Sequence, residues 1–214
     1  MRAFWNKYLV ILTTTKDILL HPFAFGSTIH DSIEDTKRAA VYLGEGVVFF
    51  YAIYSALNAG YGPDLPLSNL PFAGEILAAA MIASAMLTGL ITHPIANFFS
   101  SRSNSVYGSL ACFLYWSGFC LFVIPPVFAV LIVGAQGLFG ILNLAEDLKL
   151  LIMMAIMVPV VFVYYMGTIS SWIGSVYGIE PFMGGIAVAC SYALFMGVGS
   201  ALAAVIAFAS GDSF

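Results

Sequence analysis

Residues 90–126 read LITHPIANFFSSRSNSVYGSLACFLYWSGFCLFVIPP, and this stretch decides how the rest of the chain is interpreted. It contains the end of one apolar run, a short polar segment, and a second apolar run that stops at Pro125 and Pro126. Arg102, in the polar segment, is the only cation between residues 38 and 149. Long apolar runs on both sides of a charged turn are typical of helices that cross a membrane.

Composition indicates the same class of protein along the whole chain. Of the 214 residues, 61% are hydrophobic and 8% are charged, whereas a soluble domain has about 25% charged residues. We therefore expect an all-α, polytopic transmembrane helix bundle that lies in the lipid bilayer and has no separate soluble domain. The acidic balance of charges and the lack of a basic cluster argue against a nucleic-acid partner.

Six membrane-spanning helices are predicted within residues 39–214. They cover about 39–60, 73–92, 106–124, 127–143, 150–172 and 183–209. Two adjacent prolines between two apolar runs are typical of a tight turn, so Pro125 and Pro126 are placed between the third and fourth spans. A single helix over both runs would hold the prolines in its interior, where each removes a hydrogen bond and clashes with the preceding turn.

Residues 1–38 are expected to form a cytoplasmic and interfacial segment. Five large apolar residues recur there at helical spacing with cations on either side, which is typical of an amphipathic helix in the headgroup region. These residues are Trp5, Tyr8, Leu9, Ile11 and Leu12. His21 and Pro22 end this helix, and the charges from Asp31 to Arg38 are interpreted as a solvated face and not as a site.

The distribution of cations predicts the orientation of the chain. With six spans, all seven Lys and Arg residues lie on one side of the membrane. Cytoplasmic loops carry an excess of Lys and Arg, so this side is assigned to the cytoplasm. Both termini are therefore expected in the cytoplasm.

Short motifs between about residues 15 and 170 resemble those of the Yip1-domain membrane proteins. The motifs are LLHPFAF at 19–25, NSVYGSL at 104–110, the run from Tyr115 to Pro126, and Gly137-Leu138 followed by Leu144 and Lys149. The resemblance implies a small helical membrane protein without known catalytic residues, and the family usually has five spans. Its eukaryotic members are associated with vesicle traffic and small GTPases. A chain this short is more similar to the bacterial relatives, which implies the bacterial cytoplasmic (inner) membrane.

Glu45, with Gly44 and Gly46 beside it, is the most informative polar residue within an expected span. A carboxylate inside a span is energetically costly and faces the bundle interior or water. Six residues into its span, Glu45 is expected about 9 Å from the start of the helix, near the cytoplasmic boundary. Two interpretations stay open: a structural carboxylate that reaches the interface, or a proton or cation site on a polar pathway with Gln136.

His21 and His93 occur in similar contexts, His-Pro-Phe-Ala and His-Pro-Ile-Ala. Two imidazoles are able to ligate a haem, a chlorophyll-type pigment or a metal. Both histidines lie at expected helix ends, however, and no carboxylate–histidine cluster with zinc spacing accompanies them. No metal site is therefore predicted, and interfacial histidines that cap helices or form hydrogen bonds are the alternative to a pigment or haem role.

Small residues recur at every fourth position of the last expected span. They are Gly185, Ala189, Ala193, Gly197 and Ala201. Small side chains allow helix backbones to approach closely in lipid. This stripe is therefore expected to pack against another helix.

These patterns favour a non-enzymatic structural or scaffolding membrane protein, a subunit of an assembly with other membrane proteins or with copies of itself. The sequence contains no GxSxG, P-loop or HExxH motif of the kind that hydrolases and ATPases use. The first alternative is a transporter of a small solute or ion with Glu45 on its path. The second is a pigment- or haem-associated subunit that uses His21 or His93.

Overall fold

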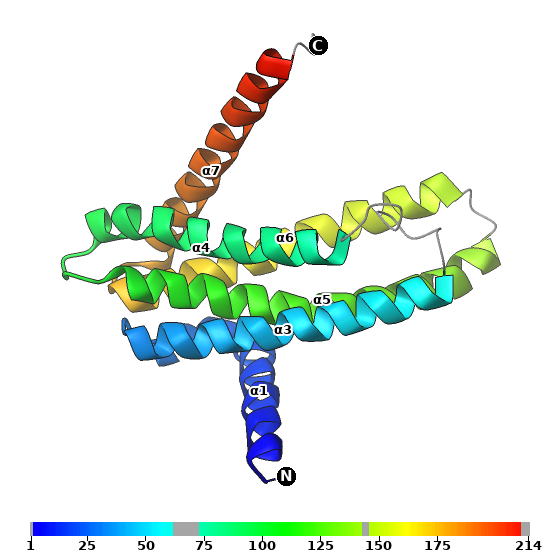
Figure 1. The fold of residues 1–214 in the computed structure, drawn as a ribbon, viewed down its shortest axis with the longest axis horizontal. Helices are drawn as coiled ribbons and strands as arrows, with labels where there is room; N and C mark the ends of the chain where they lie inside the picture. Colours follow the sequence, from blue (N-terminus) through cyan, green and yellow to red (C-terminus); the bar gives the residue numbers. More distant parts are fainter. Residues whose placement is uncertain (1, 62–72, 143–145, 211–214) are drawn as a thin grey trace.

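The computed structural model describes residues 2–61, 73–142 and 146–210, and these ranges consist of helices and short turns without a strand (Figure 1). Side-chain surroundings are described mainly for residues 8–56, 75–123 and 162–200. The elements, in chain order, are α1 Arg2–Leu20, α2 Pro22–Phe25, the short 3-10 helix η1 Gly26–Thr28, α3 Ile33–Tyr61, α4 Ala73–Phe99, α5 Val106–Leu142, α6 Glu146–Tyr177 and α7 Pro181–Ser210. The all-α class expected from the sequence is confirmed for these ranges.

Four long helices lie alongside one another, and two others leave this layer. In Figure 1, α3, α4, α5 and α6 extend in roughly the same direction, whereas α1 and α7 point away on opposite sides. α3 packs mainly on α5, and α7 packs on α4 and α6. The starts of α3, α5 and α7 meet the ends of α4 and α6 at one end of the layer. We call this end, residues 30–38, 93–108 and 177–181, the polar end.

The helix α5 corrects the predicted number of spans. It is uninterrupted, so the expected spans 106–124 and 127–143 are one helix of 37 residues. At 1.5 Å per residue it is about 55 Å long, which exceeds the hydrocarbon core of about 30 Å. The predicted turn at Pro125 and Pro126 is wrong because apolar residues flank both prolines. An open turn there would leave several backbone groups unpaired in lipid, whereas a helix that continues through proline loses fewer hydrogen bonds.

The continuous α5 also changes the distribution of cations. Arg102 precedes the start of α5, and Lys149 lies in the first turn of α6, just after the end of α5. The two residues are therefore at opposite ends of α5 (Figure 1). The prediction that all seven cations lie on one side assumed two spans between these residues, and the structure has a single helix, α5, in their place. The argument that placed both termini in the cytoplasm fails with it, because one helix replaces two antiparallel spans.

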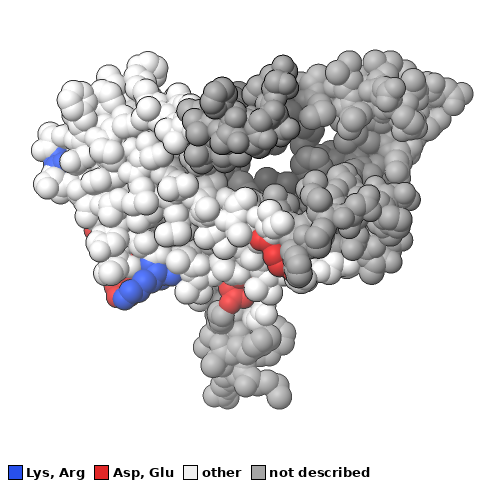
Figure 2. Space-filling model, turned by 45° about the horizontal axis from the view of Figure 1, so that its top comes forward, with Lys and Arg blue, Asp and Glu red and all other residues white. Residues whose placement is uncertain are grey.

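Three segments among the described residues are long and apolar enough to cross a membrane. They are Ala78–Phe99, Val106–Val123 and Pro181–Ser200. Figure 2 shows that charged atoms are few on the described part of one face and gather in small groups. Both observations fit the membrane protein that the composition indicates.

Glycines bring α3 and α5 into close contact. A Cβ on Gly118 would lie 2.7 Å from the ring of Tyr42, and a Cβ on Gly46 would lie 3.0 Å from the carbonyl oxygen of Gly118. Backbones approach this closely only where a side chain is missing. Gly44, two residues before Gly46, faces open space instead. The two glycines that flank Glu45 therefore differ in their surroundings.

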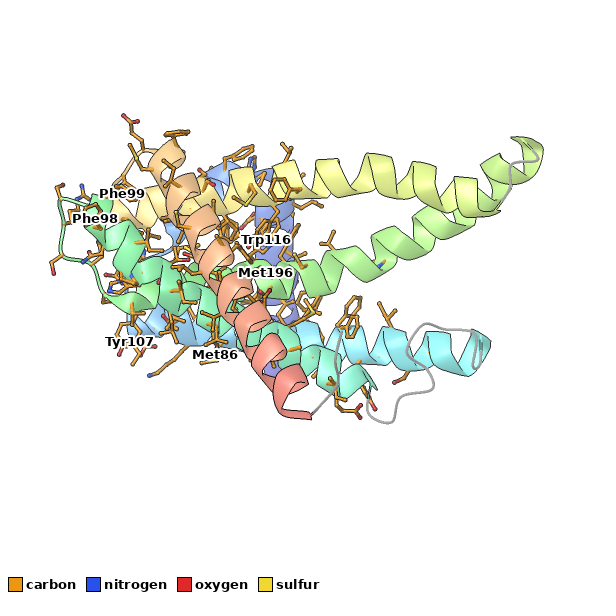
Figure 3. The ribbon with its side chains drawn as sticks, turned by 90° about the horizontal axis from the view of Figure 1, so that it is seen from above. Met86, Phe98, Phe99, Tyr107, Trp116 and Met196 are labelled. Atoms are coloured by element: carbon orange, nitrogen blue, oxygen red, sulfur yellow. The ribbon has the colours of Figure 1, made fainter. Side chains whose placement is uncertain are left out.

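Aromatic rings fill the core between α2, α5 and α6. Trp172 is fully buried, and its ring centroid lies 5.9 Å from that of Trp116. Phe25 of α2 has its centroid 5.1 Å from that of Trp172 and 5.5 Å from that of Tyr115. Figure 3 shows Trp116 between α5 and α6. The short α2 is held against the bundle by these contacts.

We expect Gly118→Ala to destabilise the protein and Gly44→Ala to leave it unchanged or slightly more stable. The methyl group of the first variant meets the buried Tyr42 ring, and overpacking of this kind costs about 1–3 kcal/mol. The second variant places its methyl group in open space and gains up to about 1 kcal/mol of helix propensity. Thermal unfolding in a mild detergent compares the two, and equal midpoints would contradict a close α3–α5 contact.

Candidate functional site

Asp31 caps the N-terminus of α5 from a distant part of the chain. Its carboxylate accepts hydrogen bonds from the backbone N–H groups of Ser105 and Gly108 at 2.5 and 2.8 Å, and from the Ser105 hydroxyl at 2.5 Å. The first N–H groups of a helix have no partner within it, and the helix dipole favours an anion there. Asp31 therefore joins the segment before α3 to the start of α5.

Gly108 allows this close approach. A Cβ at Gly108 would collide with Cγ1 of Val176 and lie 3.2 Å from Oδ1 of Asp31. Thr36 adds a second hydrogen bond between the starts of α3 and α5, because its hydroxyl donates to the carbonyl oxygen of Tyr107 at 2.9 Å. The starts of α3 and α5 and the end of α6 are thereby brought together.

A second polar network joins the end of α4 to the end of α6. The Ser100 hydroxyl donates to the carbonyl oxygen of Tyr177 at 2.6 Å and accepts from the Asn104 amide at 3.0 Å. Nδ1 of His93 lies 2.8 Å from the Tyr177 hydroxyl. Tyr177 is the last residue of α6, outside the expected span 150–172, and burial raises the pKa of its hydroxyl. The hydroxyl therefore stays neutral and serves as a hydrogen-bonding partner.

Asp35 and Ser32 organise the first turn of α3. The buried carboxylate of Asp35 accepts from the His30 backbone N–H at 2.6 Å and lies 3.4 Å from Nη1 of Arg38. The Ser32 hydroxyl accepts from the backbone N–H of Asp35 at 3.2 Å, which is the geometry of an N-cap. Both side chains fix where α3 begins.

These contacts correct the interpretation of the charges from Asp31 to Arg38 as a solvated face. Asp31 and Asp35 hold backbone groups in place, and only the outer side chains of this segment face solvent. A signal for part of this arrangement was present: Ser32 and Ser105 each precede a helical stretch, as N-cap residues do. The carboxylate that completes the second cap comes from 74 residues away, and no local pattern indicates it.

Glu45 lines a cavity between α1, α3 and α5. The cavity has a volume of about 450 Å³. Its lining residues are Tyr8, Ile11, Leu12, Thr15, Glu45, Val48, Phe49, Ala52 and Phe122. Apart from the carboxylate and two hydroxyl groups, this lining is apolar, which is the usual character of a ligand pocket.

Glu45 lies further from the start of its helix than predicted. α3 begins at Ile33, so Glu45 is 12 residues, or about 18 Å, from the helix start. The neighbouring Gly46 packs on Gly118, which is itself 12 residues into α5. The expected 9 Å is too short because the helix also contains residues 33–38. Glu45 therefore lies well below the polar end.

The two histidines of the repeated His-Pro motif have different surroundings. His93 contacts Tyr177 of α6, whereas His21 is exposed and occupies the N-cap position of α2 without a side-chain hydrogen bond to that helix. Within the described ranges, no group of three or more His, Cys, Asp or Glu side chains is placed to hold a metal ion. Gln136 lies in α5, but its side chain is outside the described ones, as is its predicted part in a polar pathway.

The packed face of α7 differs from the predicted small-residue stripe. At the first stripe position, Gly185, a Cβ would lie 3.0 Å from Oγ of Ser170. Further along, Ala193 is exposed and Gly197 has no atom within 4 Å of its Cβ position. The closest approach is instead at Gly184, where a Cβ would collide with the carbonyl oxygen of Ser170.

The direction of α7 explains this difference. Ser191 lies on the packed face, with its hydroxyl 2.9 Å from that of Thr92, but α7 then diverges from the other helices (Figure 1). Ala189 is exposed and borders a cavity beside Tyr165, and the side chain of Ala201 is outside the described ones. The second half of the stripe therefore points away from the described bundle.

Comparisons with protein-family models, with curated proteins and with solved structures give no match to this chain. The functional interpretation therefore depends on three features of the geometry. These are the polar end, the cavity beside Glu45 and the exposed half of α7.

We expect Asp31→Ala to destabilise the protein by about 1–3 kcal/mol, because the first N–H groups of α5 lose a charged acceptor. Asp31→Asn keeps a carbonyl acceptor and loses the charge, so its effect is smaller. Asp17→Ala, in an exposed position of α1, is the control. Thermal unfolding in detergent measures all three, and an Asp31→Ala variant as stable as the control would rule out an important role for this cap.

Proposed function

We propose that the protein is a non-enzymatic integral membrane protein that acts as a scaffold. It associates through the outer half of α7, residues 193–200, with other membrane subunits or with a second copy of itself. The proposal is based on the direction of α7, a helix with the composition of a membrane span. Its outer half diverges from α3, α4, α5 and α6, and its small residues there do not contact them.

The outer half of α7 has the exposure expected of an unfilled helix contact. Only 22% of the segment Pro181–Ser200 is buried within the chain. Met196 is 63% exposed and lies on the part of α7 that crosses over the bundle in Figure 3. A Cβ on either Gly197 or Gly199 would have no atom within 4 Å. Glycine weakens a helix by about 1 kcal/mol relative to alanine, and close approach of a partner helix in lipid offsets that cost.

The chemistry of the polar end supports a structural role. Its carboxylates, Asp31 and Asp35, accept hydrogen bonds from backbone groups at helix starts. Its buried hydroxyl, on Tyr177, is close to His93. Side chains used in this way hold helix ends together and are not arranged as a nucleophile with its base.

The resemblance to the Yip1-domain proteins supports the same assignment. That family usually has five spans, and within the described ranges α3 to α7 are five helices of 27 residues or more. We place the polar end in the cytoplasm of a bacterial cell, with the five spans in the inner membrane and α1 at its surface. Lys37, Arg38 and Arg102 lie at the polar end, and Arg2, Lys7 and Lys16 lie on α1, which we assign to the same side. Five spans then place the C-terminus on the opposite side.

Transport of a small solute or ion is the second candidate function. The observation in its favour is that Glu45 lines a cavity about 18 Å from the start of α3. A carboxylate at such a depth marks a substrate or ion path in many membrane proteins. The lining of this cavity is mainly apolar, however, and a path for ions requires polar groups in series. No comparable feature of the described residues favours a bound pigment or haem.

Cysteine labelling tests the revised topology. In a variant without Cys112, Cys120 and Cys190, we expect Lys149→Cys to react with a membrane-impermeant thiol reagent in intact spheroplasts. Arg102→Cys should react only after lysis, because α5 carries the chain across the membrane between these positions. Equal accessibility of both positions would instead indicate two spans between them.

Substitution of the outward glycines tests the scaffold function. We expect Gly197→Leu to reduce co-purification of partner chains from native membranes in mild detergent, because the larger side chain separates the helices. Gly44→Leu is the matched control: it has the same open surroundings but lies on α3, outside the proposed surface. A monodisperse free protein with no partner or second copy, or an equal effect of both variants, would contradict the proposal.

A further inference from the structure

A cavity near the polar end has a charged part and an apolar part. It lies beside α3 where α1 leaves the layer of long helices (Figure 1), and its volume of about 690 Å³ is within the range of small-molecule pockets. The four charged residues that line it belong to the first two turns of α3, and the rest of its lining is apolar or carries a hydroxyl group. We call it the amphipathic cavity.

The chemistry of the amphipathic cavity changes in a fixed order along α3. Glu34, Arg38 and Val41 all line it, and because they are spaced at i, i+4 and i+7 they lie on one face of the helix. Arg38 follows Glu34 by about 6 Å along the helix axis, and Val41 follows Arg38 by about 4.5 Å. From the polar end inward, this wall is therefore acidic, then basic, then apolar.

The Arg38 side chain has hydrogen-bond donors to spare. Among the described side chains, its one acceptor is the buried Asp35, whose Oδ1 lies 3.4 Å from Nη1 of Arg38. Asp35 also accepts from the His30 backbone N–H, whereas 73% of the Arg38 side chain is exposed. Residues 1–7, whose side chains are outside the described ones, include no Asp or Glu that would compete for it. A guanidinium has five N–H donors in a fork that matches a phosphate group.

The Glu34 carboxylate is accessible to a cation of a ligand. Its Oε1 lies 3.3 Å from Nζ of Lys37, and the side chains of this pair are 69% and 64% exposed. Exposed ion pairs of this kind contribute little to stability. A carboxylate accepts about four hydrogen bonds through its two oxygens, so an ammonium group has room beside Lys37.

The apolar part of the cavity favours a ligand with a hydrocarbon chain. In its wall, the ring centroid of Tyr115 lies 5.8 Å from that of Tyr42 and 5.5 Å from that of Phe25. Val10 and Val41 line the cavity and are 63% and 55% exposed, so a chain is able to enter from the surrounding membrane. A soluble phosphate compound would leave this apolar surface uncovered.

We propose that the amphipathic cavity binds a phospholipid whose head group carries a primary amine. The ammonium group pairs with Glu34, the phosphate pairs with Arg38, and an acyl chain lies against Val41 and Val10. Amine, phosphate and hydrocarbon follow one another in such a lipid in the same order as acid, base and apolar surface along α3. The proposal does not involve α7, so it stands or falls separately from the scaffold function.

Binding to the full-length protein in a nonionic detergent tests the proposal, with native mass spectrometry as the readout. Three probes share one lauroyl chain: lysophosphatidylethanolamine, lysophosphatidylcholine, whose ammonium has no N–H, and lysophosphatidylglycerol, which has no amine. Glycerophosphoethanolamine is the head group without a chain. We expect one saturable site for lysophosphatidylethanolamine and at least about tenfold weaker binding of the other three probes. No saturable binding of this lipid, or equal binding of any other probe, would overturn the proposal.

Variants of the charged residues assign the two parts of the head group. Glu34→Gln should reduce the preference for lysophosphatidylethanolamine over lysophosphatidylglycerol to near unity, because the amine loses its charged partner. Glu180→Gln, at an exposed carboxylate between α6 and α7, should leave this preference unchanged. Arg38→Gln should weaken the binding of both lipids about tenfold, because both carry the phosphate. An unchanged preference in Glu34→Gln would refute the site.

A second pair of variants tests the apolar part and leaves every charge in place. Val41→Phe should weaken binding of lysophosphatidylethanolamine by filling the cavity. Val48→Phe is the matched control, because Val48 lies on the same helix, is 65% exposed and does not line this cavity. Should Arg38→Gln fail to fold, this pair and Glu34→Gln still decide the matter. Undiminished binding in Val41→Phe would contradict the proposed position of the chain.

Discussion

The hydrogen bonds between the Asp31 carboxylate and the first turn of α5 set the register of the bundle. Asp31 precedes α3 by two residues, so this cap starts α3 and α5 at the same level and in the same direction. Gly46 lies 13 residues after the start of α3, and Gly118 lies 12 residues after the start of α5. Because both helices rise equally per residue, the two glycines meet, and the closest backbone contact of the pair follows from the cap.

Different interactions stabilise the polar end and the apolar parts of the helices. At the polar end, directional hydrogen bonds from Asp31, Ser100 and Asp35 hold helix ends in place. Away from it, contacts depend on shape, since lipid provides no hydrophobic drive for helices to associate. Where α1 crosses α3, the hydroxyls of Thr15 and Tyr42 are 2.7 Å apart, and the helices beside this contact leave the cavity that Glu45 lines. The Glu45 carboxylate and the cavity therefore lie together where α1 crosses α3.

The divergence of α7 gives the chain two different surfaces in the membrane. Its first turns are locked to α4 and α6 through Gly184 and Ser191. Beyond them, large apolar side chains and glycines are exposed together on one helix. The first part holds α7 in a defined direction, and the second part is exposed. This exposed surface is the one that we propose as the contact with other helices.

The sequence by itself determined the class of protein and the features that depend on a few neighbouring residues. A chain that is 61% hydrophobic cannot cover itself with polar groups in water, so the membrane class follows from composition. The end of α1 before Pro22 and the polar turn around Arg102 follow from local signals.

The tertiary structure alone decided whether Pro125 and Pro126 end a helix, what Asp31 does and where α7 points. Proline has the same local effect in a kink as in a turn, and the choice depends on whether neighbouring groups satisfy the opened backbone. Asp31 finds its partner 74 residues away. The outward face of α7 depends on its crossing with α4 and α6 and not on its own pattern of small residues. In each case the outcome depends on interactions between segments that are distant in the chain, and no local sequence pattern indicates these interactions.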